Sequence, residues 1–176
     1  MAHPSHWQKD MTIRRLSPSD ITEYRRLRLR GLRESPAALG SSYSEEVKRP
    51  AGAFVDRLRQ APGRWTMGAF DNDQLVGVLR LIREDKIKER HKASIFGMYV
   101  DRRWRRKGIG RALLKHAIEI ARQLRGLKQV KLAVVEGNHP ALHLYETAGF
   151  KVYGREVAAL YVGGGYYSEL FLVLRW

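Results

Sequence analysis

The sequence predicts a single-domain α/β protein. Its 176 residues lie within the usual range of about 100–200 residues for one domain. An apolar fraction of 44% and an aromatic fraction of 10% are typical of a globular chain with a core. The apolar spacing alternates along the chain between the period of a strand and that of a helix, without a repeat or a linker. We therefore expect one domain over residues 11–176, preceded by a polar segment, residues 1–10, that is expected to be a flexible tail.

The first elements are a strand and a helix. Thr12–Leu16 is predicted as a short strand. Ser17 is suited to cap the next helix, Pro18 suits its first position, and Asp20 can reach back to the cap. The helix is expected over Ile21–Arg33.

One face of this helix mixes apolar and basic residues. At 100° per residue the apolar members are Ile21, Tyr24, Leu29 and Leu32. Arg25 and Arg28 fall within the same arc. These arginines either lie along the edge of the apolar stripe with their charges in water or line a cleft that the helix borders.

The middle of the chain predicts a second helix and three strands that look antiparallel. The helical stretch covers about Ser44–Gln60. Arg64–Phe70 and Gln74–Ile82 flank the turn residues Asp71–Asp73, which indicates a hairpin. His91–Val100 is the third strand.

The C-terminal half alternates helices with strands. The predicted helices are Gly108–Arg125 and Asn138–Gly149. The predicted strands are Gln129–Val135, Phe150–Val162 and Tyr166–Leu174, the last two joined by three glycines.

Composition excludes several classes of protein. The formal net charge is +15 and there is no cysteine, so disulfides, thiolate metal sites and a cysteine nucleophile are excluded. The six His form no spaced ligand cluster, and no metal is expected. The longest apolar run, Val157–Val162, is far shorter than the ~20 residues of a membrane span. Because the first residues also lack an apolar signal region, we expect a cytoplasmic protein with no membrane partner.

The stretch RRWRRKGIGRALL, Arg102–Leu114, joins a basic loop to the start of a helix. A helix N-terminus has unpaired N–H groups and a partial positive charge, and Gly108 and Gly110 would let a ligand approach the main chain closely. This pattern indicates a phosphate or pyrophosphate site. It does not fit a Walker motif, because Arg111 follows Gly110, nor a dinucleotide fingerprint, because Leu113 is too large.

A second segment, Val134–Phe150, makes the pattern more specific. Together the two stretches resemble the GCN5-related N-acetyltransferase (GNAT) family. The family's loop, Arg/Gln-x-x-Gly-x-Gly/Ala, corresponds to Arg105–Gly110. Its later motif is matched by Asn138, Ala141, Leu144, Tyr145, Glu146, Gly149 and Phe150. The resemblance is strongest over residues 94–155, and the order of elements extends it to most of the chain.

The resemblance implies a mixed central sheet of about six or seven strands with helices on both faces. It also implies acetyl-CoA as co-substrate and direct transfer of the acetyl group to an amine. The main-chain N–H groups of residues 106–111 would hold the pyrophosphate, and the Arg105 or Lys107 side chain would neutralise part of its charge. The cofactor-binding residues expected in this loop are Arg105, Arg106, Lys107, Gly108, Ile109, Gly110 and Arg111.

The family also splays two neighbouring parallel strands, here residues 95–100 and 131–135, around the pantetheine arm. The main chain of Met98 and Val100 would bind its amides, and Gly97 suits a bulge. A main-chain N–H near Met98 or Tyr99 could polarise the thioester carbonyl.

Tyr145 lies where the family has its general acid and would protonate the leaving thiolate. Asn138 and Tyr145 are also expected to contact the cofactor. From the residues alone, Tyr145 could equally be a core aromatic and Asn138 a turn or helix-capping residue.

The general base cannot be assigned from the sequence. Ser94 lies where family members often have Glu. The alternative candidates are Glu84, Asp85, His91, Glu136 and Glu169. Proton loss through ordered water, or a substrate amine of low pKa, are further alternatives.

Other functions remain as alternatives. Two basic runs, with Trp104 as a stacking residue, could bind nucleic acid, although this partner is disfavoured because the runs lie on a helix and in a tight loop. A cofactor-binding regulator without catalysis is a further alternative. The acceptor could be a small amine, an amino acid, an antibiotic or a protein amine, and the apolar C-terminal hairpin could form a homodimer.

Overall fold

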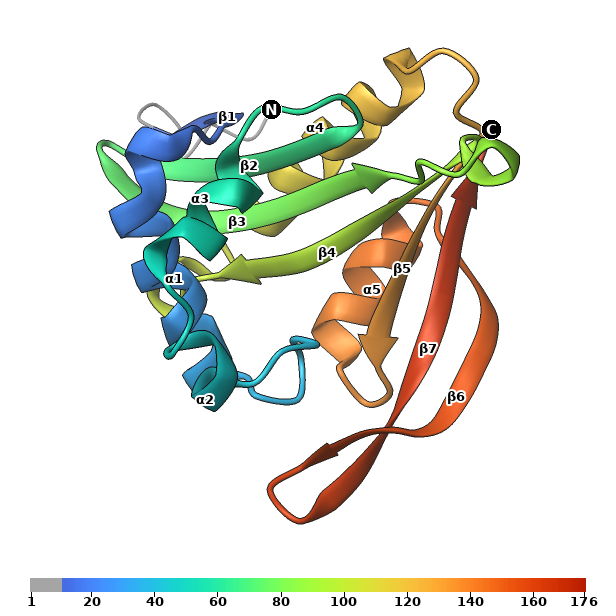
Figure 1. Cartoon of the computed structure of the whole chain (residues 1–176). Helices are drawn as coiled ribbons and strands as arrows, with labels where there is room; N and C mark the ends of the chain where they lie inside the picture. The colour runs from blue at the N-terminus through green and yellow to red at the C-terminus, as the bar shows by residue number, and fades with distance from the viewer. Residues whose placement is uncertain (1–10) are drawn as a thin grey trace, which may run out of the picture.

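The computed structural model describes residues 11–176 and shows one mixed sheet with helices on both faces (Figure 1). The sheet order is β1-β2-β3-β4-β5-β7-β6. The strands are β1 (Met11–Arg15), β2 (Arg64–Asp71), β3 (Gln74–Arg83), β4 (Lys92–Val100), β5 (Gln129–Val135), β6 (Lys151–Val162) and β7 (Gly165–Arg175). The helices are α1 (Ile21–Glu34), α2 (Tyr43–Glu46), α3 (Ala51–Leu58), α4 (Ile109–Gln123) and α5 (His139–Thr147). The predicted fold class is confirmed. The tail expected at residues 1–10 lies outside the described part of the chain.

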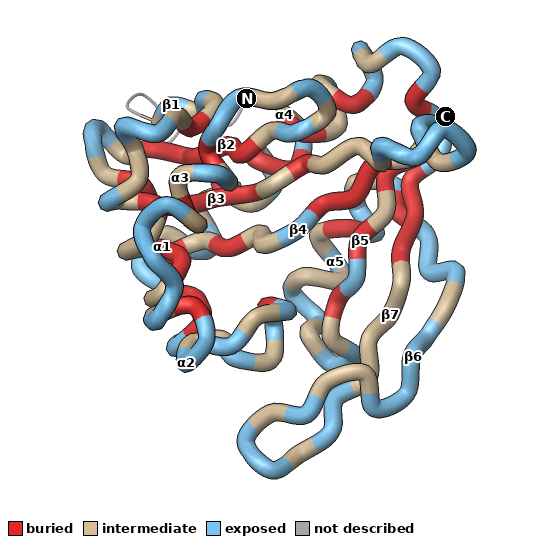
Figure 2. The backbone as a smooth tube through the Cα atoms, viewed as in Figure 1, coloured by how far each residue is buried: buried red, intermediate tan, exposed pale blue. Residues whose placement is uncertain are grey.

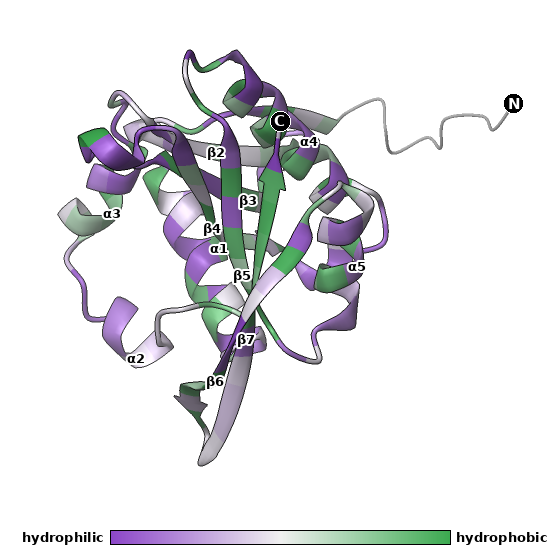
Figure 3. Ribbon diagram, turned by 90° about the vertical axis from the view of Figure 1, so that its right-hand side faces the viewer, coloured by the Kyte–Doolittle hydropathy of each residue, from purple (hydrophilic) through white to green (hydrophobic). Residues whose placement is uncertain are grey.

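Two apolar clusters fix the helices on opposite faces of the sheet (Figures 1 and 3). Tyr24 and Leu27 of α1 pack with Phe54 of α3 against one face. Leu113 and Ala117 of α4 and Tyr145 of α5 belong to the larger cluster on the other face. Figure 2 shows that the buried segments concentrate in the central strands, whereas β6 is mostly exposed.

The parallel pair β4 and β5 separates along its length. The two strands pair only from Lys92↔Gln129 to Ser94↔Lys131, and then they diverge (Figure 1). A bulge in β4 accompanies the divergence: Val78 pairs with Tyr99 but Arg80 pairs with Phe96, so Gly97 and Met98 share one position opposite β3. Gly97 has a φ of +59°, a conformation that glycine adopts without strain. The predicted splay and bulge are therefore present.

The helix start predicted after the first strand is confirmed. The Ser17 N–H donates to the Asp20 carboxylate at 2.8 Å, and Pro18–Asp20 form a single 3₁₀ turn, η2, before α1 begins. This capping satisfies main-chain donors that a helix N-terminus would otherwise leave unpaired.

Two predictions about the first helices were wrong. Residues 44–60 form two helices, α2 and α3, because Pro50 lacks the N–H needed inside a helix and instead lies at the cap of α3. On α1 the buried face contains Leu27 in place of Leu29, which is only half-buried. The helix is rotated because it packs against α3 as well as the sheet.

None of the helices among residues 11–176 is both long and apolar enough to cross a bilayer.

Candidate functional site

A cleft of about 460 Å³, here called the main cleft, opens where β4 and β5 separate. Its walls come from β4, from the loop before α4, from α5 and from the segment after α1. The predicted site residues that line it are Met98, Tyr99, Val100, Arg105, Arg106, Gly110, Asn138 and Tyr145. The fold thus brings together residues from both sequence motifs.

The other predicted loop residues do not line the main cleft. Ile109 is buried in the core, Lys107 lies over the Trp104 ring at 5.9 Å, and Arg111 lines a separate groove. Any contact of these residues with a ligand in the main cleft would have to be made by their main chain.

The main chain of the loop is preorganised for an anion. Gly108, the N-cap of α4, has a φ of +77°, and Arg106 has a φ of +64°, which is uncommon for a residue with a side chain. Among residues 11–176, no hydrogen-bond acceptor faces the N–H groups of residues 106–111, and the Ala112 N–H makes the first bond of the helix, to Gly108. Unpaired N–H groups in such a turn, at the positive end of a helix, form an anion site.

Side chains around the loop hold it in place. The Trp104 indole N–H donates to Asp71 at 2.8 Å, and the ring packs against the main core. Asp101 is buried, accepts the Arg103 N–H at 3.1 Å and pairs with Arg30 of α1. Trp104 is therefore an anchor for the loop and cannot stack freely on a nucleic-acid base.

Arg105 also makes contacts within the protein. Its Nε donates to the Val100 carbonyl at 3.0 Å, and a guanidinium nitrogen lies 4.0 Å from Glu34. Part of its charge is therefore compensated within the protein.

Strand alternation decides which β4 groups face the main cleft. The Asp101 N–H donates to Val76 of β3 at 2.8 Å, so the main chain of Val100 faces away from β3 and that of Tyr99 faces towards it. Gly97 and Met98 form the bulge, so neither of them has its own partner residue on β3. The Tyr99 side chain contacts α1, where its hydroxyl donates to Glu34.

Tyr145 lies between the core and the main cleft. The side chain is buried, with its ring 6.0 Å from that of Phe150. The hydroxyl lies 3.5 Å from the Met98 sulfur. Burial raises the pKa of Tyr145 to about 12, so the hydroxyl retains its proton at neutral pH. Tyr145 is therefore a core aromatic that also lines the main cleft.

Asn138 caps α5. Its side-chain oxygen accepts the Ala141 N–H at 3.4 Å, and the residue also lines the main cleft. The capping role that the sequence left open is present in the structure, and it leaves the amide nitrogen of Asn138 available to a ligand.

A second cavity, of about 390 Å³, adjoins the main cleft and is here called the bulge cavity. It shares Ala38 and Leu39 with the main cleft. Ser94 and Glu169, from β4 and β7, line it. The bulge cavity therefore continues the cleft through the gap between the splayed strands.

Glu169 is the one residue among the five candidate bases that lines the bulge cavity. Burial, with the neighbouring charge of Glu156, raises the pKa of Glu169. Glu84 accepts the Ser94 hydroxyl at 3.3 Å, and Glu136 is exposed and pairs with Arg155 at 2.7 Å. Asp85 and His91 are exposed at the far end of β4.

The two arginines of α1 have different environments. Arg25 donates to the Val47 carbonyl at 3.2 Å and lines no cavity described here. Arg28 is buried, pairs with Glu46 at 3.0 Å and borders a third cavity. Arg28 thus borders a cavity, as one interpretation expected, whereas Arg25 fits neither interpretation, because it lines no cavity described here and its Nε is buried.

The basic run on α1 is used within the protein. Apart from Arg25 and Arg28, Arg26 pairs with Glu23, Arg30 with Asp101, and Arg33 contacts Tyr43. Arginines that already have intramolecular partners offer little to a polyanion, so this run does not support a nucleic-acid surface.

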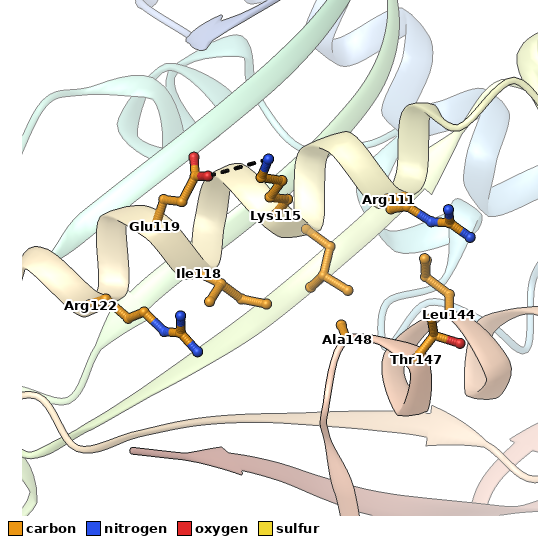
Figure 4. Close-up of a pocket in the computed structure, with 9 residues that line it drawn as sticks. Arg111, Lys115, Ile118, Glu119, Arg122, Leu144, Thr147 and Ala148 are labelled. Atoms are coloured by element: carbon orange, nitrogen blue, oxygen red, sulfur yellow. Dashed lines mark ion pairs between the residues drawn. The ribbon is translucent and has the colours of Figure 1, made fainter. Parts of the chain in front are cut away.

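A groove between α4 and α5 lies outside the splay (Figure 4). Apolar Ile118, Leu144 and Ala148 form its floor, with Arg111 and Arg122 at its two ends (Figure 4). Lys115 pairs with Glu119 at 3.8 Å along its edge. None of the residues that line this groove also lines the bulge cavity, and Leu144 lines both this groove and the main cleft.

Metal ligands do not gather in the described chain. Among residues 11–176 there is no group of three or more His, Asp or Glu side chains that could hold a metal ion.

Comparison with known proteins adds an independent observation. The sequence model of the acetyltransferase (GNAT) family matches residues 29–150. The L-amino acid N-acetyltransferase AaaT of Escherichia coli (strain K12) is 30% identical over 101 residues, covering 57% of this chain and 62% of that protein. The streptothricin acetyltransferase of Streptomyces lavendulae is 46% identical over 59 residues, covering 34% of this chain and 30% of that protein. The matched regions span less than two thirds of the length of these relatives.

Solved structures share the fold over nearly the whole chain. An acetyltransferase of the GNAT family from Streptococcus pneumoniae has a TM-score of 0.84 at 22% identity, over 94% of this chain and 98% of that one. The structure of yncA from Salmonella typhimurium with its cofactor acetyl-CoA has a TM-score of 0.77 at 19% identity, over 94% and 93%.

Proposed function

The chain belongs to the acetyltransferase (GNAT) family, and we propose on this basis that it is an acetyl-CoA-dependent N-acetyltransferase. The acceptor is a primary amine, and the acetyl group moves directly while both substrates are bound. The observation that carries the proposal is the set of unpaired N–H groups of residues 106–111 at the head of α4, beside the gap between β4 and β5.

Acetyl-CoA fits the main cleft by its chemistry. Its pyrophosphate would accept hydrogen bonds from the main chain of residues 106–111. The main chain of Met98 and Val100 faces the gap, where it can bind the amides of the pantetheine arm, and Asn138 offers its amide nitrogen from α5. Tyr99 lines the cleft, but its main chain faces β3.

Met98 is the residue best placed to stabilise the developing oxyanion. The bulge removes its main-chain N–H from the pairing with β3, and the Tyr145 hydroxyl lies beside its side chain. Bound acetyl-CoA supplies the thioester carbon that the amine attacks. A preorganised N–H that donates to the oxygen of that carbonyl is worth on the order of 3 kcal/mol in comparable sites.

Tyr145 is the proposed general acid. As the C–S bond breaks, the hydroxyl would give its proton to the leaving sulfur. Its raised pKa, about 12, keeps it protonated until the thiolate forms, and a phenol and a thiolate can then exchange a proton without an intervening base.

Glu169 is the proposed general base. An alkylammonium must lose a proton before its nitrogen can attack, and Glu169 is the candidate that lines the bulge cavity. Burial raises its pKa, which makes the carboxylate a stronger base than an exposed one. The ammonium gives one proton to Glu169 before the C–N bond forms. The nitrogen loses a second proton as the C–S bond breaks and the amide forms, and this proton balances the one that Tyr145 gives to the sulfur.

The two alternative functions predict different binding results. A catalytically silent regulator would bind acetyl-CoA without turnover, and a nucleic-acid module would bind polyanions without competition from acetyl-CoA. The cytoplasmic location and the homodimer stay predictions, and light scattering on the purified chain measures the second of these.

The test combines calorimetry with acetyl-CoA and turnover against a panel of primary amines. We expect acetyl-CoA uptake, turnover of at least one amine, and a fall in kcat of about 100-fold in Tyr145→Phe, the lower end for loss of a general acid. Tyr161→Phe, an exposed tyrosine of β6, is the matched control and should keep the parental rate. No heat of binding would contradict the proposal, whereas binding without turnover of any amine would identify the silent regulator.

A further inference from the structure

We infer that the acceptor carries an anionic group, a carboxylate or a phosphate, which Arg80 binds in a cavity beside the bulge. This inference rests on the proposed function and specifies the class of its acceptor. The cavity has a volume of about 420 Å³, and Arg28, Arg57 and Arg80 all line it. We call it the arginine cavity.

Glu46 compensates only part of this positive charge. Its carboxylate is buried and pairs with Arg28 at 3.0 Å and with Arg57 at 3.1 Å. These two guanidinium groups hold the pKa of Glu46 at about 2, against the opposing effect of burial. Glu46 is therefore a carboxylate at neutral pH, and three guanidinium groups face the cavity with one carboxylate among them.

Arg80 is the arginine without a partner. Within residues 11–176 its side chain makes no hydrogen bond or ion pair, and its Nε is fully buried. Burial lowers the pKa of Arg80. Tyr24 opposes this effect, and the nearby charges of Arg57 and Arg28 add to it. An arginine remains charged even so, and a partly buried charge without a partner is less favourable than a paired one.

An unpaired Nε alone does not indicate an anion site, as Arg25 shows. Its Nε is also buried without a partner, but its terminal nitrogen donates to the Val47 carbonyl at 3.2 Å, and it lines no cavity described here. Arg80 differs because its whole guanidinium lacks an acceptor next to an open volume. An anion with two oxygens would supply the missing hydrogen bonds in bidentate geometry.

The arginine cavity is connected to the proposed reaction centre. It shares Gly40, Phe96 and Gly97 with the bulge cavity, which in turn shares Ala38 and Leu39 with the main cleft. The bulge also comes close to the cationic wall: a Cβ built on Gly97 would lie 3.2 Å from an Arg28 nitrogen. One acceptor can thus place its amine near Glu169 and its anionic end beside Arg80.

Two matched pairs of amines test the inference and separate the two anions. They are 4-aminobutyrate against butylamine and O-phosphoethanolamine against ethanolamine. With the parent protein we expect kcat/KM for at least one anionic member to exceed that of its neutral partner at least tenfold. In Arg80→Gln this preference should disappear through a higher KM for the acceptor, with the KM for acetyl-CoA unchanged. The pair that shows the preference identifies the carboxylate or the phosphate.

Arg64→Gln is the matched control, because Arg64 is exposed on the neighbouring strand, lines no cavity described here and lies close enough to act on the pKa of Arg80 through its charge. It removes the same charge, so a change in acceptor KM equal to that of Arg80→Gln would mean a general charge effect and would overturn the inference. Equal kcat/KM for the charged and neutral amines in the parent would also overturn it.

A binding measurement covers the case in which none of the four amines is turned over. Inorganic phosphate is titrated calorimetrically into the parent and both variants, with and without saturating acetyl-CoA to occupy the loop before α4. We expect Arg80→Gln to weaken phosphate binding at least tenfold and Arg64→Gln to change it less than twofold. Unchanged phosphate affinity in Arg80→Gln would refute the anion site, even if acetyl-CoA binds normally.

Thermal unfolding separates this role from a structural one. An arginine that only stabilises the fold would lower Tm when replaced. Since Arg80 has no partner, Arg80→Gln should have a Tm equal to or above that of the parent. A clearly lower Tm together with unchanged acceptor KM would assign Arg80 to the fold and not to the acceptor.

Discussion

The loop before α4 and the arginine cavity present positive charge in different ways. The loop before α4 presents main-chain N–H groups of residues 106–111 at a helix N-terminus. The arginine cavity instead presents side chains of Arg28, Arg57 and Arg80, which come from α1, α3 and β3. The first site is exposed and local in sequence, whereas the second is partly buried and depends on residues that are distant along the chain.

This difference affects which ligand groups the loop and the arginine cavity can each recognise. Main-chain donors are present whatever the neighbouring side chains, so the loop is suited to a group shared by all donors of the reaction, a pyrophosphate. Side chains differ from one protein to another, so the arginine cavity suits the more variable partner in our proposal, the acceptor. Glu46 then limits how much positive charge remains for that acceptor.

The largest effect is expected from carboxylates in the main-chain site. Gly108→Asp with Gly110→Asp would place negative charges among the N–H groups, and Gly108 has a φ of +77°, which strains a side chain. Losing several charge-assisted hydrogen bonds should weaken acetyl-CoA binding by about 1,000-fold, roughly 4 kcal/mol, in calorimetry.

Gly164→Asp is the control for backbone strain, because Gly164 has a φ of +85° in an open hairpin turn. It should bind acetyl-CoA like the parent. Unaltered binding in the double variant would mean that the loop does not hold the pyrophosphate.

The next effect concerns the stability of the arginine cavity. Glu46→Gln leaves Arg28 and Arg57 buried without their carboxylate, and loss of one partner from such a group costs about 3 kcal/mol in the free energy of unfolding. Because the folded-state pKa of Glu46 is depressed, to about 2, its stabilisation is complete above the unfolded pKa of about 4 and is lost as pH falls from there towards 2. Denaturant unfolding between these values should show a pH dependence in the parent that is much weaker in the variant.

Glu136→Gln removes an exposed ion pair, that with Arg155, and serves as control with a much smaller change. If both variants were equally stable, the buried triad of Glu46, Arg28 and Arg57 would contribute nothing particular to the fold.

The smallest effect is expected at the proposed base. Glu169→Gln should lower kcat/KM by about 100-fold, or 2.7 kcal/mol. The parental rate should rise with pH as Glu169 loses its proton, and burial raises this pKa, so the rise should occur above the usual carboxyl range. Glu156→Gln removes the neighbouring charge and should move the rise to lower pH. A pH profile that is identical in the parent and in Glu169→Gln would exclude Glu169 as the base.

The sequence predicted the residues of the main cleft better than those of the arginine cavity. Arg105–Gly110 and Asn138–Tyr145 are contiguous motifs, and the structure places Arg106, Gly110 and Tyr145 around the main cleft. Arg80 had no such signal, since it is one arginine within the otherwise apolar stretch from Leu75 to Ile82. Arg28 was singled out only because its helical angle placed it on the apolar face.

What the sequence alone determined is the alternation of strands and helices and the glycine-containing loop before α4, because these depend on propensities and spacing within a few residues. The bulge at Gly97 was expected from the resemblance to the family. The break at Pro50 and the rotation of α1 towards Leu27 depended on tertiary structure, because helix ends and faces shift to fit their neighbours. Tertiary structure also decided that Glu46 pairs with two arginines and that Arg80, within residues 11–176, has no partner. Charges distant in sequence acquire or lose partners only when packing sets the distances between them.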